Sequence, residues 1–76
     1  MNVFEKVKEY VLQQLPVSED RITMDARMIE DLGADSANLM MLIMDLETEF
    51  DLTVEDEVLT SIKTVGDIVN YIEGHI

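Results

Sequence analysis

The chain has 76 residues, of which 47% are hydrophobic, and it carries a formal net charge of −12. This length suits one domain with a thin core, and the hydrophobic share argues against intrinsic disorder. The absence of cysteine excludes disulfides and thiolate chemistry, and the negative field disfavours nucleic acid and anionic membranes as partners. We expect residues 1–76 to form a single domain, a cytoplasmic monomer with no membrane span and no secretory signal.

A first helix is predicted near the N-terminus, where hydrophobic residues recur at helical spacing. Pro16 should end this helix, because the residue before a proline avoids the α region. The expected inner face consists of Val3, Phe4, Val7, Val11, Leu12 and Leu15.

A long connection from Pro16 to Asp35 follows, and its length indicates either a functional loop or a loop that contains a short turn. Gly33 supplies backbone freedom for the exit turn. The residues expected to pin this connection to the core are Ile22, Met28, Ile29 and Leu32.

A second helix should begin at Asp35 or Ser36, since both residue types are good N-caps. Its core stripe is expected to contain Leu39, Leu42, Ile43, Leu46 and Phe50. The opposite face carries a second apolar line, the methionine strip, which consists of Ala37, Met40, Met41 and Met44. Asp35, Asp45 and Glu47 flank this strip, so we interpret it as a docking surface for basic-rimmed apolar grooves. The alternative is that a neighbouring helix covers part of it, Met40 above all.

Two helices complete the predicted fold. A short one is expected around Glu57 to Ser61, with Val58, Leu59 and Ile62 buried. Thr64 and Asp67 stand at the spacing of a capping box before a last helix that ends at Gly74. Its inner face is expected to hold Val65, Ile68, Val69 and Ile72. The fold class is therefore an all-α bundle of three long helices and one short helix.

The residue inventory argues against catalysis and specific metal binding. The chain has one histidine, His75, next to the C-terminal residue, where it is a poor base for a hydrolase. The acidic segment from Asp51 to Glu57 lacks the central glycine and ligand order of an EF-hand. A zinc site has no suitable ligands. We expect no catalytic residue and no metal ligand.

Ser36 is the hydroxyl of greatest interest. It could simply cap the second helix. The same position would also place a phosphodiester on its oxygen at the favourable end of the helix dipole. The residues alone leave both interpretations open.

The segment Asp31-Leu32-Gly33-Ala34-Asp35-Ser36 resembles the attachment site of acyl carrier proteins, whose pattern runs Asp-x-Gly-x-Asp-Ser-Leu. The similarity extends over nearly the whole chain, in order and without gaps. Further matching segments are Ile22-Thr23-Met24-Asp25-Ala26, Leu46-Glu47-Thr48-Glu49-Phe50, Glu55-Asp56-Glu57, Thr64-Val65-Gly66-Asp67 and Tyr71-Ile72.

This resemblance implies that Ser36 receives phosphopantetheine from coenzyme A through a separate phosphopantetheinyl transferase. The arm would hold acyl groups as thioesters, with fatty acid biosynthesis as the leading interpretation, and the acyl chain would shelter among the bundle's apolar side chains. The protein would catalyse nothing; its partners would be acyl-processing enzymes with basic docking patches. The implied partner-binding residues are Asp35, Ala37, Met40, Met41, Met44 and Glu47.

Several positions depart from the family pattern. Ala37 replaces the usual Leu, Asn38 and Met41 stand where acidic residues are common, and Met28 replaces an expected Phe. Partner recognition could therefore depend more on apolar contact than on charge. Two alternatives stay open: a specialised carrier for a polyketide or aminoacyl pathway, or an unmodified acidic helical adaptor.

Overall fold

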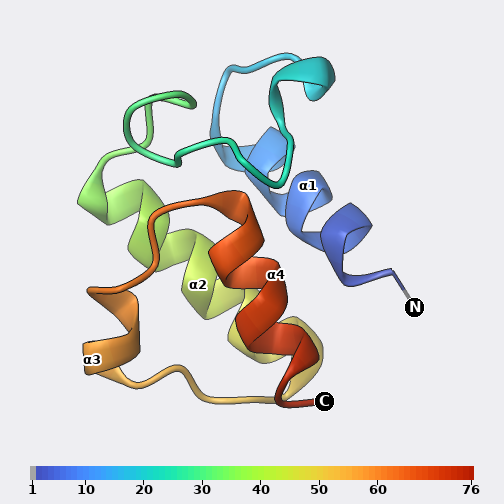
Figure 1. Cartoon of the computed structure of the whole chain (residues 1–76), viewed down its shortest axis with the longest axis vertical. Coiled ribbons are helices and arrows are strands. Elements are labelled where there is room, and N and C mark those ends of the chain that lie inside the picture. Colours follow the sequence, from blue (N-terminus) through green and yellow to red (C-terminus); the bar gives the residue numbers. More distant parts are fainter. Residues whose placement is uncertain (1) are drawn as a thin grey trace.

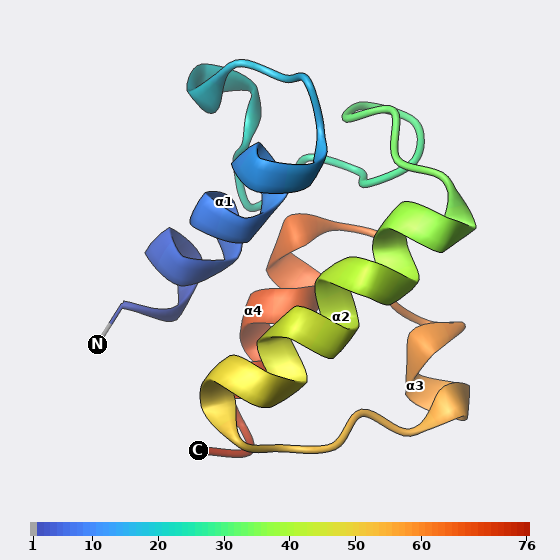
Figure 2. The same cartoon turned by 180° about the vertical axis from the view of Figure 1, so that it is seen from behind.

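The computed structural model describes residues 2–76, and the regular elements in this range are helical. Figure 1 and Figure 2 show the arrangement from two opposite sides. The elements are α1 (Val3–Gln14), a 3-10 turn (Glu19–Arg21), α2 (Ser36–Phe50), α3 (Asp56–Leu59) and α4 (Val65–Glu73). The predicted all-α bundle of three long helices and one short helix is confirmed.

Helix α1 follows the predicted pattern with one exception. The Asn2 side chain accepts a hydrogen bond from the Glu5 backbone N–H at 3.1 Å and so caps the helix. The C-cap residue Leu15 is extended, as expected before Pro16. The placement of Leu12 on the inner face was wrong, because its side chain is 38% exposed. At roughly 100° per residue, Leu12 lies well around the helix from the buried Val11.

The long connection contains the expected short turn, but one of its predicted anchors faces solvent. Met28 and Leu32 are buried, whereas Ile29 is 57% exposed. The backbone N–H groups of Asp31 and Leu32 both donate to the carbonyl oxygen of Arg27, which coils this stretch into a helix-like turn. Residues four apart then share a face, so Met28 and Leu32 point inward together and Ile29 points elsewhere.

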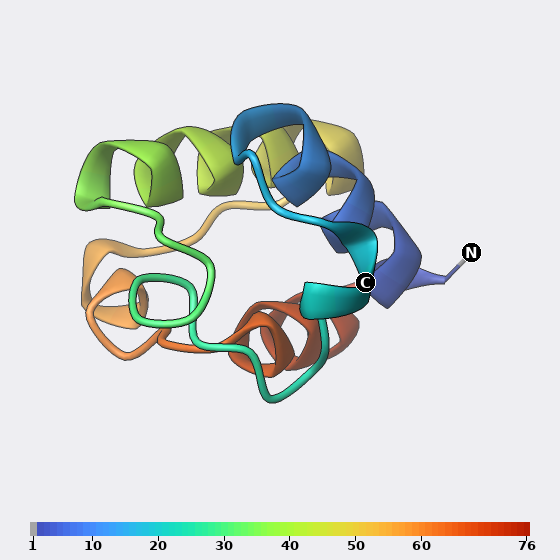
Figure 3. The same cartoon turned by 90° about the horizontal axis from the view of Figure 1, so that it is seen from above.

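The core lies between α2 and α4, which run along opposite sides of the molecule in Figure 3, with α1 at one end and α3 at the other. The largest fully buried side chains come from α1, α2, α4 and the long connection: Met28, Leu46, Ile68, Ile72, Val7, Val11, Val65 and Val69. The predicted inner faces of α2 and α4 are thereby confirmed, with Leu39 and Phe50 only partly buried.

Both ends of α4 form as predicted. The Thr64 hydroxyl accepts from the Asp67 backbone N–H at 3.1 Å, and the Asp67 carboxylate accepts from the Thr64 N–H at 3.1 Å. This pair is a capping box, and Gly74 is the C-cap. Helix α3 begins at Asp56, one residue earlier than expected.

None of the helices in residues 2–76 has the length and hydrophobicity needed to cross a bilayer.

Candidate functional site

Ser36 is the first residue of α2, and its side chain is exposed. The N-cap is Asp35, whose carboxylate accepts from the Asn38 backbone N–H at 2.8 Å. The Asn38 side-chain oxygen accepts in turn from the Asp35 N–H at 3.3 Å. Asp35, and not Ser36, therefore caps α2. The Ser36 hydroxyl makes no hydrogen bond to any of the described residues. The interpretation of Ser36 as the cap itself is thereby excluded.

The turn that leads into α2 holds Ser36 at the surface. Gly33 has a φ of 76°, in the left-handed region that favours glycine. Leu32 and Ala34 on either side are buried, and the Ala34 N–H donates to the Met28 carbonyl at 3.0 Å. The backbone is therefore anchored just before Ser36, while the serine itself faces solvent.

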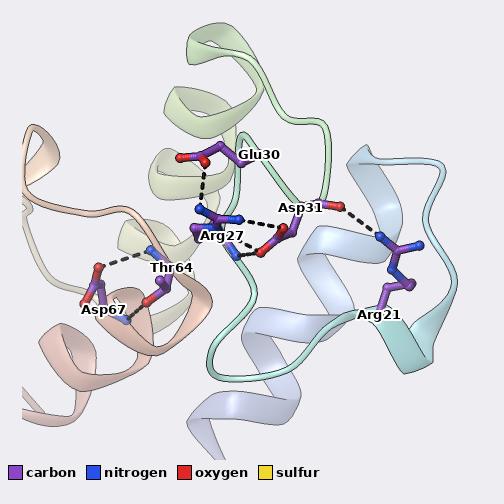
Figure 4. Close-up of polar contacts among 6 residues, drawn as sticks. All are labelled: Arg21, Arg27, Glu30, Asp31, Thr64 and Asp67. Atoms are coloured by element: carbon purple, nitrogen blue, oxygen red, sulfur yellow. Dashed lines mark hydrogen bonds and ion pairs between the residues drawn. The ribbon is translucent and has the colours of Figure 1, made fainter.

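Contacts between Arg27 and Asp31 hold the loop before Ser36 in place, as Figure 4 shows. The Asp31 carboxylate accepts from the Arg27 backbone N–H at 2.8 Å and from the guanidinium at 3.3 Å. Glu30 forms a second ion pair with the guanidinium at 2.7 Å. The backbone hydrogen bond from Arg27, followed by its side-chain hydrogen bond, holds the pKa of the Asp31 carboxyl below its usual value.

The same loop is fixed to the start of α4. The Val65 N–H donates to the Ala26 carbonyl at 2.9 Å, and the Gly66 N–H donates to the Met24 carbonyl at 2.8 Å. A Cβ atom on Gly66 would lie 2.8 Å from that Met24 oxygen, so a side chain there would force the two segments apart. Glycine at position 66 therefore permits the close approach that supports the serine turn.

The methionine strip is exposed along its whole length. Met40, Met41 and Met44 all face solvent, as does Ala37. Met40 is 46% exposed, so no neighbouring helix covers it completely. An exposed apolar line on the helix that begins at Ser36 is the kind of surface that binds other proteins.

The acidic residues beside the strip also make contacts within the bundle. Asp35 caps α2, Asp45 accepts from the Gln14 side-chain amide at 2.8 Å, and Glu47 accepts from the Val54 N–H at 2.7 Å. Glu47 is half-buried and fixes the segment after α2, a role that its position in the sequence did not suggest. The strip is therefore rimmed by negative charges whose positions are fixed.

A cavity of about 260 Å³ opens between α2, the loop and the end of α3. Leu39, one turn after Ser36, lines it together with Ile29 and Ile62, and Arg27 and Lys63 stand among its polar lining. A second, apolar void of about 10 Å³ lies deeper, between Leu46 and Ile72. A recess with both apolar and charged lining therefore starts within one helical turn of the exposed serine.

Two of these features have a recognisable signal in the sequence, although neither was predicted from it. Asp35 and Asn38 have capping-box spacing, with Asn in place of Glu or Gln. Arg27 and Asp31 are four residues apart with opposite charges. The contact of Glu47 with Val54 has no such local signal.

The comparisons with known proteins agree on one family. A family model described as "Phosphopantetheine attachment site" matches residues 5–72. The acyl carrier protein of Thermotoga maritima is 51% identical over 71 residues, covering 93% of this chain and 88% of that protein. The acyl carrier protein of Clostridium acetobutylicum is 48% identical over 73 residues, covering 96% of this chain and 95% of that protein.

The fold agrees with these sequence relatives. The solved structure of acyl carrier protein from Enterococcus faecalis superimposes with a TM-score of 0.84 at 32% identity, covering 97% of this chain and 94% of that chain.

The residues around Ser36 fit a group attached through a phosphodiester. The hydroxyl is exposed, and the first turn of α2 contains no acidic residue after the cap. The backbone N–H groups of Ser36 and Ala37 have no acceptor in the described part of the chain. Such N–H groups and the helix dipole favour negative charge at this position.

Proposed function

This chain belongs to the acyl carrier protein family, whose members carry acyl groups on phosphopantetheine and are not enzymes, and on that premise we propose that Ser36 bears the phosphopantetheine. The observation that carries this assignment is the exposed Ser36 hydroxyl, left without a partner because Asp35 and Asn38 cap α2. The match of residues 31–36 to the family pattern supports it further.

When bound, the phosphopantetheine supplies a terminal thiol that holds an acyl group as a thioester. The chain's own residues position it: Gly33 and the buried Ala34 direct Ser36 outward, and the free N–H groups at the start of α2 favour the phosphodiester charge. The clamp between Arg27 and Asp31 keeps the loop in place. Ser36 is thus presented to other proteins on a fixed turn.

Acyl-processing enzymes are the partners that the family implies, and we assign their docking surface to the methionine strip with Asp35 and Glu47. Its exposed apolar side chains and fixed acidic rim suit a partner with an apolar groove and a basic edge. The phosphopantetheinyl transferase would use the same surface, because it must approach Ser36. We also propose that residues 1–76 form one domain and that the carrier is a monomer. We place it in the cytoplasm, together with the coenzyme A on which it depends.

Fatty acid synthesis is the pathway that we propose for this carrier. The recess that begins at Leu39 could shelter an aliphatic chain close to Ser36. The deeper void of about 10 Å³ has room for about one water-sized group, so a longer chain would have to push Leu46 and Ile72 apart. A specialised carrier for polyketide or aminoacyl groups is the second candidate, favoured by Met41 at a position where the family commonly has an acidic residue.

The acylation test compares the two pathways directly. The phosphopantetheine-bearing protein is offered a fatty acyl group and an aminoacyl group by their respective loading enzymes, and the product is treated with hydroxylamine, which cleaves thioesters. We expect fatty acyl loading that hydroxylamine reverses. If only the aminoacyl enzyme loads the protein, the result would instead assign the carrier to a specialised pathway.

The docking surface is tested by Met41→Glu, which restores a charge to the strip. Slower loading by the fatty acid enzymes is the expected result, because a charged side chain would then stand inside the apolar contact. Asn70→Glu, which adds the same charge at an exposed position of α4, is the matched control. Equal rates for the wild type and Met41→Glu with every candidate enzyme would refute a role for Met41 in docking.

A further inference from the structure

The methionine strip has a chemical property that other apolar side chains would not give it. Met40, Met41 and Met44 are 46%, 58% and 59% exposed, whereas Met28 in the core is 1% exposed. Leucine would provide similar apolar area on a helix surface without a thioether. We propose that the strip is a modification site, at which hydroperoxides oxidise the three methionines to sulfoxides and thereby switch off partner docking.

The spacing concentrates the effect of oxidation on one surface. Met44 lies four residues after Met40 and three after Met41, so both are its neighbours on the helix. Each sulfoxide replaces an apolar thioether with a polar, chiral group. Three such changes on adjacent side chains would turn an apolar contact surface into a hydrated one.

The reaction is a two-electron oxygen transfer. The sulfur lone pair attacks the terminal oxygen of the hydroperoxide, a sulfur–oxygen bond forms, and the oxygen–oxygen bond breaks. With hydrogen peroxide, the attacked oxygen loses its proton to the second oxygen, which leaves as water. Sulfur is oxidised, the peroxide is reduced, and no other reactant is needed. Methionine sulfoxide reductases reverse the change.

The fold should survive this modification. The three strip methionines have no place in the buried core, which is formed by other residues. Met28 is the one methionine of residues 2–76 that belongs to the core, and burial keeps peroxide from its sulfur. Oxidation should therefore affect docking without unfolding the bundle.

Met24 provides an internal control. It is 40% exposed and so is open to peroxide, but it lies in the long connection and not on α2. Its oxidation should not affect docking. Met1 lies outside the residues that the structure describes, and peptide mapping measures its oxidation separately.

This inference rests on the proposed function of the strip, and the experiment separates the two. The apo protein is treated with hydrogen peroxide, mapped by mass spectrometry, and then offered to a phosphopantetheinyl transferase with coenzyme A. We expect rapid oxidation at Met40, Met41 and Met44, slow oxidation at Met28, and an unchanged melting curve. The kcat/KM for transfer should fall about tenfold or more, as for loss of interface hot-spot contacts.

The controls compare the rate after peroxide with the rate before it in each variant. In the Met40→Leu, Met41→Leu, Met44→Leu triple variant this ratio should stay near one, whatever the starting rate. In Met24→Leu it should fall as in the wild type. Treating the oxidised wild type with methionine sulfoxide reductases should restore transfer, which tests the proposal even if the triple variant folds or docks poorly.

Two results would overturn the inference. One is full oxidation of the strip with no change in the transfer rate. The other is oxidation of Met28 as fast as that of Met44, because lost activity would then reflect unfolding. Failure of the unoxidised wild type to accept the group at all would instead refute the assignment of Ser36 and its docking surface.

Discussion

The Tyr10 hydroxyl donates a hydrogen bond of 2.6 Å to the Glu49 carboxylate and so joins α1 to the end of α2. The two residues are 39 positions apart in the chain. The hydrogen bond to Glu49, followed by partial burial, raises the pKa of Tyr10 to about 12. The contact therefore holds together the two helices that frame one side of the core.

Because the folded pKa of Tyr10 is above its ordinary value of 10.0, its contribution to stability should be complete below pH 10 and lost as the pH rises through about 12. Titration of the tyrosine absorbance should show a phase near pH 12, and Tyr10→Phe should remove this phase and lower the melting temperature. Tyr71→Phe is the matched control, since its hydroxyl donates to the Thr53 carbonyl and not to a carboxylate. A single phase near pH 10 in the wild type would contradict the contact.

Asp31 should stabilise the loop before Ser36 only while it is ionised. Its pKa is below the ordinary value of 3.8, so this stabilisation is present above that pH and is lost as the pH falls through the folded pKa. Asp31→Asn should therefore melt at a lower temperature than wild type near neutral pH, and the difference should shrink in acid. Asp25→Asn removes the same charge from the same loop and serves as the control. Equal melting temperatures for the two variants at neutral pH would count against the Arg27 clamp.

The glycine at position 66 is required by close packing rather than by its backbone angles. Gly66→Ala would place a Cβ 2.8 Å from the Met24 carbonyl oxygen, and we expect a loss of about 1–3 kcal/mol, as for other overpacked sites. The nearest atom to a Cβ on Gly74 would be 3.4 Å away, so Gly74→Ala should be nearly neutral. Chemical denaturation measures both. A Gly66→Ala variant as stable as wild type would show that the loop is not held against α4 in this way.

Salt should stabilise this protein. The net charge is −12, and the stretch between Met28 and Ile62 has many carboxylates but no Lys or Arg. Their mutual repulsion destabilises the compact state and is screened by ions over a Debye length of about 10 Å at 0.1 M ionic strength. The melting temperature should rise when sodium chloride is added at neutral pH. A melting temperature that does not respond to salt would mean that this repulsion does not limit stability.

The sequence predicted the parts of the fold that depend on local patterns. The ends of α2 and α4 follow from capping chemistry at Asp35, Thr64 and Gly74, and the core faces follow from helical periodicity. Ile29 was misplaced because an apolar residue in a long loop has no periodicity to show which way it points.

The candidate site, like the fold, was predictable from the sequence only in part. The exposed strip follows from the periodicity of one helix, whereas Ser36 was singled out by the resemblance of residues 31–36 to a family pattern. The contact of Glu47 with the Val54 N–H depends on how the chain returns after α2, and that of Tyr10 with Glu49 depends on how α1 packs. Such pairings between distant segments are fixed by the tertiary fold, and no spacing in the sequence encodes them.

The most direct test of Ser36 as the carrier residue is the intact mass of the purified protein after incubation with coenzyme A and a broad-specificity phosphopantetheinyl transferase. Wild type should gain the mass of one phosphopantetheine, and Ser36→Ala should gain none. Ser61→Ala is the matched control: its hydroxyl donates to the Val58 carbonyl at 2.8 Å, and we expect this variant to be modified like wild type. Modification of Ser36→Ala, or no modification of wild type by an active transferase, would contradict the assignment.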